Sequence, residues 1–460
     1  MPTFKVISPN NNRSYAERTY ATDTEIKRAL EKSATAQREW QNTAIEVRKK
    51  ICLKAVSALL ARQSGIAEEL SWQIGRPLRY TPGEIKGFAE RARHMARIAT
   101  DKLTDIEIET SAESTKLIRR TPHGIVFSIV PWNYPYLTAV NVIIPALMAG
   151  NSVIMKPSSQ TPLTAERLFE AFETAGLPPG LFQHLFLDHT SSTRLIQHEA
   201  INYVSFTGST QGGRDIEAAA VGRFIDVGLE LGGKDPAYVR SDAELEQSVE
   251  NLVDGAFFNS GQSCCGIERI YVHKALYQVF CDNFIALTRE YRLGDPLHPD
   301  TTLGPMVNAA AATRVRNQIS DAIKQGATAT IDEKLFPASK AGTAYLAPQV
   351  LLNVDHSMAV MRDESFGPVV GIMSVDSDEQ AIELMNDSPY GLTASIWTTD
   401  QESALNIGNQ LETGTCFMNR CDYLDPTLAW SGVKNSGKGC SLSELAYERL
   451  TQPKSFYFHR

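Results

Sequence analysis

Three short segments of the sequence hold side chains that could carry out nucleophilic chemistry. The first is a polar, glycine-containing loop ending in Cys264 and Cys265, where a thiol with a lowered pKa or an adjacent base would act as a nucleophile. The second places Glu230 between two leucines and before two glycines, so its carboxylate is either a buried pair partner or a general base with a raised pKa. The third holds Asn133 in a turn between two prolines, from which its amide could donate a hydrogen bond to a developing oxyanion.

Each segment also has a purely structural explanation. A cysteine considered alone is usually a small buried hydrophobe, and a turn bounded by prolines can simply be rigid. Residue types therefore leave the chemistry open, and the elements that position these segments must decide.

Alternating strand and helix patterns surround the three segments. Runs rich in β-forming residues are separated by helical stretches such as residues 162–175, and the alternation starts again after residue 233. These runs cover residues 124–130, 152–156, 182–187, 203–208 and 224–231. Repeated strand–helix units predict parallel, doubly wound sheets, whose ligand sites lie beyond the carboxyl ends of the strands.

Local patterns predict further elements. Two capping boxes, Thr22 with Glu25 and Thr43 with Glu46, predict the starts of N-terminal helices. Residues 116–130 form two strand-like runs around a turn at 121–124, which predicts a hairpin arm. The C-terminal run KSFYFHR is a strand without a nearby partner, so we expect it to pair with this arm or with another subunit.

Composition excludes several classes of protein. The 460 residues carry a net charge of −8 without a concentrated basic stripe, which argues against a nucleic-acid partner. No apolar run reaches membrane-spanning length and the N-terminus has no signal-peptide core, so a cytoplasmic location without membrane contact is expected. Seven cysteines without CxxC pairs predict free thiols and no metal site.

Seven motifs together resemble the aldehyde dehydrogenase superfamily, in its NAD(P)-dependent hydrolytic type. They follow the family's order over nearly the whole chain, and the glutamate precedes the cysteine by the family's spacing. The motifs are PWNYP at 131–135, VIMKPS at 153–158, FTGSTQGG at 206–213, LELGGK at 229–234, GQSC at 261–264, ESFGPV at 364–369 and GVKNSGKG at 432–439. Any one of them is a weak signal, whereas seven in sequence are a strong one.

The resemblance implies oxidation of an aldehyde to a carboxylic acid through a thioester. Cys264 occupies the nucleophile position, Glu230 the position of the base that activates water, and Asn133 the oxyanion position. The family binds NAD or NADP although the chain has no GxGxxG fingerprint. By similarity, the cofactor residues are Trp132, Lys156, Ser159, Gly208, Ser209, Gly213, Glu364 and Phe366. Because Ser159 stands where many NAD-preferring members have a glutamate, use of NADP is a hypothesis.

The resemblance also implies the architecture. The expected fold is α/β, with a doubly wound parallel-sheet cofactor domain, a second α/β catalytic domain and a small β oligomerisation arm. We expect residues 1–102 and 124–232 to form the NAD(P)-binding domain, residues 233–435 the catalytic domain, and residues 103–123 and 436–460 the oligomerisation element. A homodimer or a homotetramer is implied.

Some positions depart from the family's pattern and leave alternatives open. Val142, Cys440 and Ser441 replace a lysine and an Arg-Glu pair that many hydrolytic members carry near the base, so the route of protons from Glu230 is open. A coenzyme A-acylating enzyme and a non-catalytic protein with the same fold are the alternatives. Glu230 argues against the first, and the intact set of cysteine, glutamate and asparagine argues against the second.

The substrate is the least readable feature. No cluster of arginines indicates a charged aldehyde. Asp422 and Asp425 could favour an amino-aldehyde, although acidic loop residues are more often simply solvated.

Overall fold

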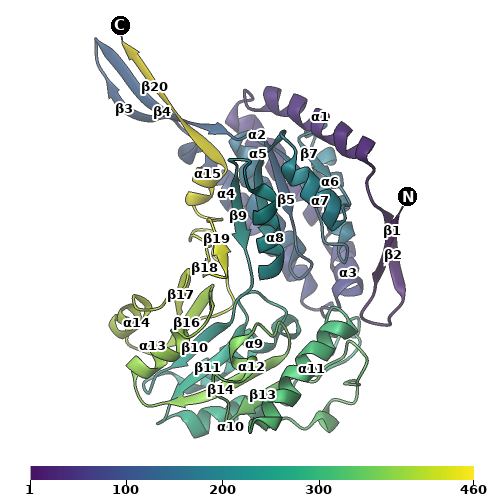
Figure 1. Cartoon of the computed structure of the whole chain (residues 1–460), viewed down its shortest axis with the longest axis vertical. Coiled ribbons are helices and arrows are strands. Elements are labelled where there is room, and N and C mark those ends of the chain that lie inside the picture. Colours follow the sequence, from purple (N-terminus) through teal and green to yellow (C-terminus); the bar gives the residue numbers. More distant parts are fainter. Residues whose placement is uncertain (1, 460) are drawn as a thin grey trace.

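Two parallel sheets, each packed against helices, account for most of the chain, and a three-stranded arm projects from one end (Figure 1). The computed structural model describes residues 2–459. The two helix-covered sheets confirm the predicted α/β fold.

The first sheet has six strands in the order β19-β9-β8-β5-β6-β7. Strands β5 to β9 run parallel, and β19 pairs antiparallel with β9. The chain first adds β6 and β7 on one side of β5 and then β8 and β9 on the other, so the order reverses between β5 and β8. The strands are β5 (Ile125–Ile129), β6 (Ser152–Lys156), β7 (Phe182–His184), β8 (Ile201–Thr207), β9 (Asp226–Glu230) and β19 (Gly437–Lys438).

Helices cover both faces of this sheet because successive strand side chains point to opposite faces. Val126 and Val153 pack into one hydrophobic core and Phe127 and Ile154 into another. Burial on both faces explains the continuous apolar runs of these strands. The helices on the first face are α2 (Ile45–Leu60), α3 (Gln63–Ile74), α4 (Thr81–Lys102), α5 (Pro135–Ala149), α6 (Pro162–Thr174) and α15 (Leu445–Arg449); those on the second are α1 (Asp23–Trp40), α7 (His189–Gln197) and α8 (Thr210–Ala220).

The second sheet has seven strands in the order β12-β13-β14-β11-β10-β16-β17, parallel except for β12. Its strand order reverses between β10 and β16. The strands are β10 (Asp235–Val239), β11 (Ile267–His273), β12 (Thr328–Ala329), β13 (Gln349–Leu352), β14 (Val369–Val375), β16 (Thr393–Trp397) and β17 (Thr415–Met418). The accompanying helices are α9 (Leu245–Phe257), η1 (Phe258–Gly261), α10 (Tyr277–Thr288), α11 (Ala309–Lys324), η2 (Glu333–Leu335), α12 (Ala359–Arg362), α13 (Asp378–Asn386) and α14 (Gln401–Gly408).

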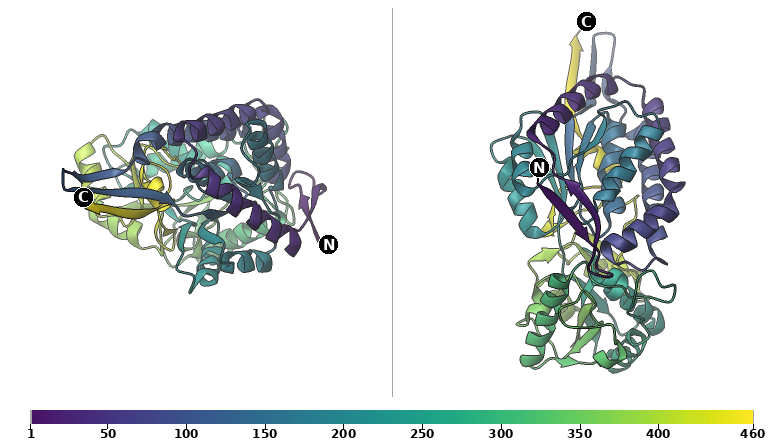
Figure 2. Two further views of the ribbon diagram at one scale, coloured as in Figure 1. Left: turned by 90° about the horizontal axis from the view of Figure 1, so that it is seen from above. Right: turned by 90° about the vertical axis from the view of Figure 1, so that its right-hand side faces the viewer.

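The projecting arm is a separate three-stranded sheet in the order β20-β4-β3 (Figure 2). The C-terminal β20 (Thr451–His459) pairs antiparallel with the whole of β4 (Ser114–Pro122), and β4 pairs with β3 (Ile106–Thr110). Two short ribbons complete the fold, β1 (Thr3–Ile7) with β2 (Ser14–Thr19) and β15 (Tyr390–Gly391) with β18 (Val433–Lys434). Pairing of the C-terminal strand with the arm confirms one of the two predicted partners.

Two local predictions were wrong. Strand β4 forms its hairpin with β3, and β5 belongs to the first sheet instead, because all five β5 residues are buried as in a central parallel strand. Helix α2 begins after Ala44 with no side-chain cap, so the predicted box of Thr43 and Glu46 does not form. The box of Thr22 and Glu25 is confirmed at the start of α1.

The carboxyl ends of the first sheet meet the amino ends of the second. Only four residues separate Glu230, the last residue of β9, from Asp235, the first residue of β10. Cys264 and Glu364 precede β11 and β14, and the Gly233 N–H donates to the Glu364 carboxylate at 3.1 Å. This junction gathers most of the predicted site residues. Among residues 2–459 no helix is both long and apolar enough to span a membrane.

Candidate active site

A cavity of about 370 Å³ opens at the junction of the two sheets, and both Cys264 and Glu230 line it. Thr207, at the carboxyl end of β8, and Tyr134, which precedes α5, contribute further walls. The predicted nucleophile and the predicted base therefore share one cavity, although 33 residues separate them in the sequence.

The two adjacent cysteines have different surroundings. Cys264 is partly exposed in the cavity wall, whereas Cys265 is only 2% exposed. The Cys265 thiol donates a hydrogen bond to Asp422 Oδ1 at 3.1 Å. Its hydrogen bond to Cys264 and its burial hold the pKa of the Cys265 thiol well above its usual value. Because only the thiolate is a strong nucleophile, Cys264 is the better candidate of the two.

A strained turn carries the chain from α9 to Cys264. Asn259 and Ser260 adopt left-handed backbone conformations, with φ of 51° and 57°, which non-glycine residues rarely adopt. Gly261 shares this conformation, and a side chain there would meet the Gly367 carbonyl oxygen at 2.2 Å. The Ser260 hydroxyl donates to the Gly304 carbonyl at 2.7 Å and helps to fix the turn. The strain is typical of a site whose surroundings hold a reactive group in place.

The Asn133 side chain lies beside this turn. Its amide Nδ2 donates to the Gln262 carbonyl oxygen at 3.1 Å, two residues before Cys264. An amide nitrogen carries two protons, so one remains for a second acceptor. The backbone N–H of Cys264 donates to no other residue between 2 and 459. Two donors are therefore available at the turn that carries Cys264, although Asn133 itself is 6% exposed and does not line the cavity.

Arg76 connects the asparagine turn to the cysteine turn. Its guanidinium donates to the Asn133 carbonyl oxygen, to Asn259 Oδ1 at 3.0 Å and to the Glu84 carboxylate. Glu84 also accepts the Tyr136 N–H at 2.8 Å. Arg76 and Glu84 are both almost fully buried, and removing one partner of such a pair typically costs about 3–5 kcal/mol. This buried pair was not predicted, because no spacing rule links a residue after α3 to one in the first turn of α4.

Glu230 is held by hydroxyl groups. Thr207, its neighbour across β8 and β9, donates to Glu230 Oε2 at 3.0 Å, and the Ser441 hydroxyl donates to Oε1. Burial raises the pKa of this carboxyl, against the opposing effects of Ser441, Thr207 and the cation of Arg91. A raised pKa makes Glu230 a stronger base than an exposed glutamate.

The positions that depart from the family's pattern lie on the far side of Glu230. A second, very small cavity of about 20 Å³ is lined by Glu230, Val142, Cys440, Ser441 and Arg449. A space of this size admits about one water molecule. Ser441 and the Glu230 carboxylate therefore line this small space together, where the family's pattern predicts a longer acidic side chain in place of Ser441.

Most predicted cofactor residues lie at the carboxyl edge of the first sheet. Lys156 ends β6, and burial lowers the pKa of its amine, against the attraction of Asp188. Ser159 follows on the surface. Ser209 caps α8 by accepting the Gly212 N–H at 3.1 Å, directly after β8. These positions flank the point at which the strand order reverses, where doubly wound sheets bind ligands.

The remaining glycines and the residues of the second sheet complete this edge. Gly208 lies against the Phe206 ring and Gly213 is buried against Leu231, so both allow close packing at the start of α8. Trp132 and Phe366 form an edge-to-face pair with ring centroids 5.7 Å apart. Burial raises the pKa of the Glu364 carboxyl to about 7.

These residues fit a dinucleotide. Lys156 forms no ion pair with any described residue, so its largely buried amine is free to bind hydroxyl or phosphate oxygens. The free N–H groups at the start of α8 favour an anion such as a pyrophosphate. Within residues 2–459, no cluster of three His, Cys, Asp or Glu side chains could hold a metal ion.

Comparison with known proteins identifies the family. The sequence profile of the aldehyde dehydrogenase family matches residues 2–456. The 3-sulfolactaldehyde dehydrogenase of Priestia aryabhattai is 32% identical over 461 residues, covering 98% of this chain and 94% of the relative.

Solved structures agree with this assignment. Succinic semialdehyde dehydrogenase from Streptococcus pyogenes in complex with NADP⁺ superimposes with a TM-score of 0.94, at 28% identity over 99% of this chain and 100% of the other. A point mutant of betaine aldehyde dehydrogenase from Staphylococcus aureus in complex with NAD⁺ gives a TM-score of 0.93, at 28% identity over 100% of this chain and 94% of the other. The chain therefore belongs to the aldehyde dehydrogenase family and is an NAD(P)-dependent oxidoreductase that converts an aldehyde to a carboxylic acid through a cysteine thioester.

Proposed function

We propose that Cys264 is the nucleophile of this oxidation, Glu230 the general base and Asn133 the oxyanion donor. The observation that carries the assignment is the shared cavity of Cys264 and Glu230, with the Asn133 amide bonded to the carbonyl two residues before the thiol. Cys265 is excluded as the nucleophile because it is buried and its thiol is held by Asp422.

The first half of the reaction forms a carbon–sulfur bond. The Cys264 thiolate adds to the aldehyde carbon, and the carbonyl electrons move to oxygen. The resulting alkoxide accepts hydrogen bonds from the Asn133 amide and from the Cys264 N–H. Loss of one such donor raises the barrier by about 3 kcal/mol. When bound, NAD(P)⁺ supplies the hydride acceptor for the oxidation of this adduct to a thioester.

The second half hydrolyses the thioester. Glu230 takes a proton from a water molecule, whose oxygen bonds to the acyl carbon while the carbon–sulfur bond breaks. The carboxylic acid leaves and Cys264 returns as a thiolate. Ser441 and Thr207 hold the Glu230 carboxylate in place. The proton then leaves Glu230 toward the small cavity that Glu230 and Ser441 both line, which has room for about one water molecule to accept it.

We further assign the cofactor contacts to the edge of the first sheet. Lys156 and Glu364 would bind ribose hydroxyls, Gly208, Ser209 and Gly213 would receive the pyrophosphate, and Trp132 and Phe366 would wall the site. Ser159 leaves no carboxylate next to a 2′-phosphate, which supports use of NADP. Initial rates with NAD and with NADP test this preference, and a large preference for NAD would defeat it.

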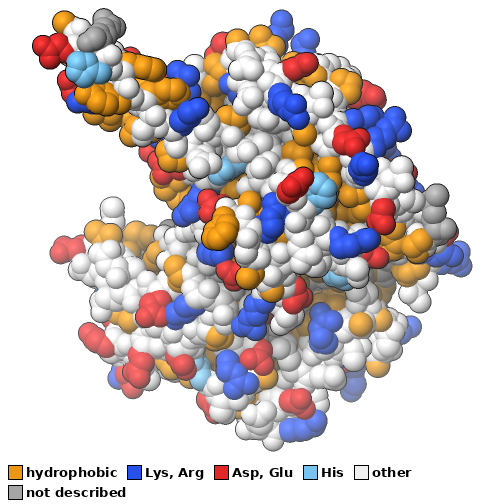
Figure 3. Space-filling model, turned by 45° about the horizontal axis from the view of Figure 1, so that its top comes forward, with side chains coloured by type: hydrophobic (Ala, Val, Ile, Leu, Met, Phe, Trp, Pro, Cys, Tyr) orange, Lys and Arg blue, Asp and Glu red, His pale blue; other side chains and the backbone are white. Residues whose placement is uncertain are grey.

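Residues 1–102 and 124–232 are proposed as the cofactor domain, residues 233–435 as the catalytic domain, and residues 103–123 and 436–460 as an oligomerisation element. Support for the last comes from the arm, whose two outer strands carry exposed Ile106, Ile108, Tyr457 and Phe458 (Figure 3). A sheet with open edges and exposed apolar side chains favours a second copy of the chain as partner. Light scattering should give a dimer or tetramer, and a shorter chain ending at residue 450 should give monomers.

A cytoplasmic location is also proposed, since all seven cysteines are free. Fractionation of the source cells would check it.

Formation of NAD(P)H from a panel of aldehydes tests the reaction, with and without coenzyme A. The assignment predicts formation that does not need coenzyme A and that disappears in Cys264→Ala. Dependence on coenzyme A would instead support an acylating enzyme, and no formation with any aldehyde would support a protein without turnover. Cys416→Ala is the matched control, because Cys416 lies within β17 and does not line the cavity, and it should retain activity.

A further inference from the structure

One arginine in the wall of the active-site cavity has no carboxylate partner. Arg91 lies on α4 and is only 8% exposed. Its Nη1 donates to the Leu137 carbonyl oxygen at 2.9 Å and to Asn141 Oδ1 at 3.3 Å. Its Nε and Nη2 donate to no residue between 2 and 459. The Nε and Nη2 groups of the guanidinium are thus free to donate hydrogen bonds to a ligand in the cavity.

Arg76, which also lines the cavity, differs from Arg91 because all three of its guanidinium nitrogens donate hydrogen bonds. Arg76 uses Nε, Nη1 and Nη2 to bind Asn259, Glu84 and the Asn133 carbonyl. The two carboxylates that act on the pKa of Arg91 are already engaged, Glu84 by Arg76 and Glu230 by two hydroxyl groups. The positive charge of Arg91 therefore lacks a dedicated counter-ion.

An unpaired buried charge is costly, and arginine cannot escape the cost by losing its proton. Burial lowers the pKa of Arg91, whereas the negative groups of the site, Cys265, Glu230, Glu84 and Cys264, act to raise it. Arg91 thus lies within electrostatic reach of the reacting thiol. A planar fork with free N–H groups matches the two oxygens of a carboxylate, a sulfonate or a phosphate.

The cavity also contains acids that would favour the opposite charge. Asp422 faces it, but its carboxylate already accepts hydrogen bonds from Ser263 at 2.6 Å and from Cys265 at 3.1 Å. Asp254 keeps contact with solvent at the cavity rim, and partial burial together with Asp422 raises the pKa of its carboxyl to about 6. Glu90, a further acid of the cavity wall, is exposed. Asp422 is thus hydrogen-bonded and the other two acids reach solvent, so Arg91 is the buried charge of the cavity without a counter-ion.

We propose that Arg91 binds an anionic group of the substrate, so that the preferred substrates are short aldehydes bearing a carboxylate, sulfonate or phosphate. This inference rests on the proposed nucleophile, because it places the anionic group in the cavity of Cys264. It also explains why no arginine cluster is visible in the sequence: a single arginine, isolated by folding, suffices.

The test compares aldehydes of similar length and different charge. For the unchanged enzyme, kcat/KM should be about 10- to 100-fold higher for 4-oxobutanoate than for butanal, the range expected of a charged hydrogen-bonded pair. Sulfonate and phosphate analogues of the same length identify which oxyanion is preferred. A preference for butanal, or for a trimethylammonium aldehyde, would overturn the proposal and point to Asp254 and Asp422 instead.

Variants separate binding from structure. Arg91→Met should lose about 10- to 100-fold in kcat/KM with 4-oxobutanoate and keep butanal within about threefold, and Arg91→Lys should recover part of the loss. Equal losses of kcat/KM with both aldehydes would show that Arg91 only links α4 to α5, and they would contradict the proposal. Arg93→Met, on the exposed side of the same helix, is the control.

Two failures can be told apart. Oxidation of butanal by the unchanged enzyme reports on the proposed reaction, whereas the ratio between the two aldehydes reports on Arg91. If Arg91→Met does not fold, the ratio of kcat/KM between 4-oxobutanoate and butanal in the unchanged enzyme still tests the proposal.

Discussion

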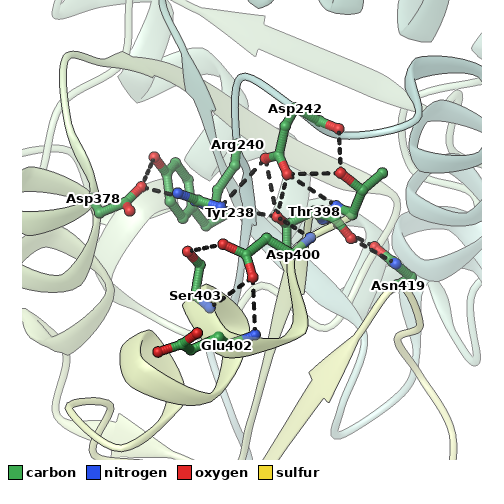
Figure 4. A network of polar contacts seen from close by, with 10 residues as sticks. Tyr238, Arg240, Asp242, Asp378, Thr398, Asp400, Glu402, Ser403 and Asn419 are labelled. Carbon is green, nitrogen blue, oxygen red and sulfur yellow. Dashed lines mark hydrogen bonds and ion pairs between the residues drawn. The ribbon is translucent and has the colours of Figure 1, made fainter.

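The points at which the strand order reverses differ sharply between the two sheets. In the first sheet, the residues that follow β5 and β8 border the proposed cofactor site and the cavity of Cys264. In the second sheet, the residues that follow β10 and β16 form a closed polar network (Figure 4). Both sheets are parallel at this point, so topology alone does not make a site.

The network at the second sheet engages most of its own polar groups. Arg240, directly after β10, donates to Asp378 at 3.1 Å and to Thr398, directly after β16, at 2.9 Å. Thr398 in turn donates to Asp242 at 2.7 Å, and its backbone exchanges two hydrogen bonds with the Asn419 side chain. Among these side chains, Nη2 of Arg240 alone donates to no residue between 2 and 459.

The first sheet leaves polar groups free at the same place. Among residues 2–459, the Lys156 amine has no ion-pair partner and the Cys264 N–H has no acceptor. The Nε and Nη2 groups of Arg91 also donate to no residue in this range. Doubly wound sheets thus become binding sites where folding leaves buried donors unsatisfied, and structural junctions where it satisfies most of them. Four experiments test this contrast.

Asn133→Ala and Asn419→Ala remove the same amide from the two sheets. Asn133→Ala should lower kcat about 100- to 1,000-fold, because an oxyanion donor is lost. Asn419→Ala should leave kcat unchanged and lower the stability of the fold. If steady-state assays gave the same loss of kcat in both variants, the two junctions would not differ in the way described.

Lys156→Met should raise the KM for NAD(P) about 10- to 100-fold, because hydrogen bonds from a cation are lost. Lys274→Met is the control, since Lys274 follows β11 on the other sheet and pairs with Asp376 on the surface. Steady-state kinetics at varied cofactor concentration measure both. An unchanged KM in Lys156→Met would remove this residue from the cofactor site.

Arg240→Met should lower the free energy of unfolding by about 1–2 kcal/mol, because several partly exposed hydrogen bonds are lost. Urea denaturation followed by circular dichroism measures the change. The kcat and KM values should stay within error, since the network lies away from the cavity. A kinetic defect without a loss of stability would show that the second junction also serves the reaction.

Ser441→Ala should give the smallest effect. Its hydroxyl lowers the pKa of Glu230 against burial, so the variant's Glu230 should have a still higher pKa. The acidic limb of the pH–rate profile should therefore move to higher pH, with a loss of about two- to tenfold at low pH that disappears at high pH. A shift to lower pH would contradict the role given to this hydroxyl.

The sequence predicted the alternating elements, and it led to the proposed catalytic residues, for a simple reason. Strands buried on both faces leave continuous apolar runs, and the motifs around Cys264 and Glu230 are local in sequence. The predicted capping box of Thr43 and Glu46 does not form, because helix α2 begins one residue later than predicted and has Ala44 as its N-cap. The hairpin partner was missed although the β3 sequence IEIET alternates apolar and polar residues. All five residues are exposed, so no packing against a core accompanies the pattern.

The contacts that complete the site were beyond prediction from the sequence. The pairing of Arg76 with Glu84 and the lack of a partner for Arg91 depend on which helices pack together. No local sequence pattern predicts this packing. Asp422, expected to be simply solvated, instead accepts hydrogen bonds from Ser263 and Cys265.

Trapping the acyl-enzyme tests the central claim most directly. Glu230→Gln should form the thioester but hydrolyse it slowly, so one equivalent of NAD(P)H should appear rapidly, followed by turnover reduced about 100- to 10,000-fold. Mass spectrometry of peptides from the quenched variant should locate the acyl group on Cys264. An acyl group on Cys265 or another cysteine, or a first turnover as slow as the later ones, would contradict the account.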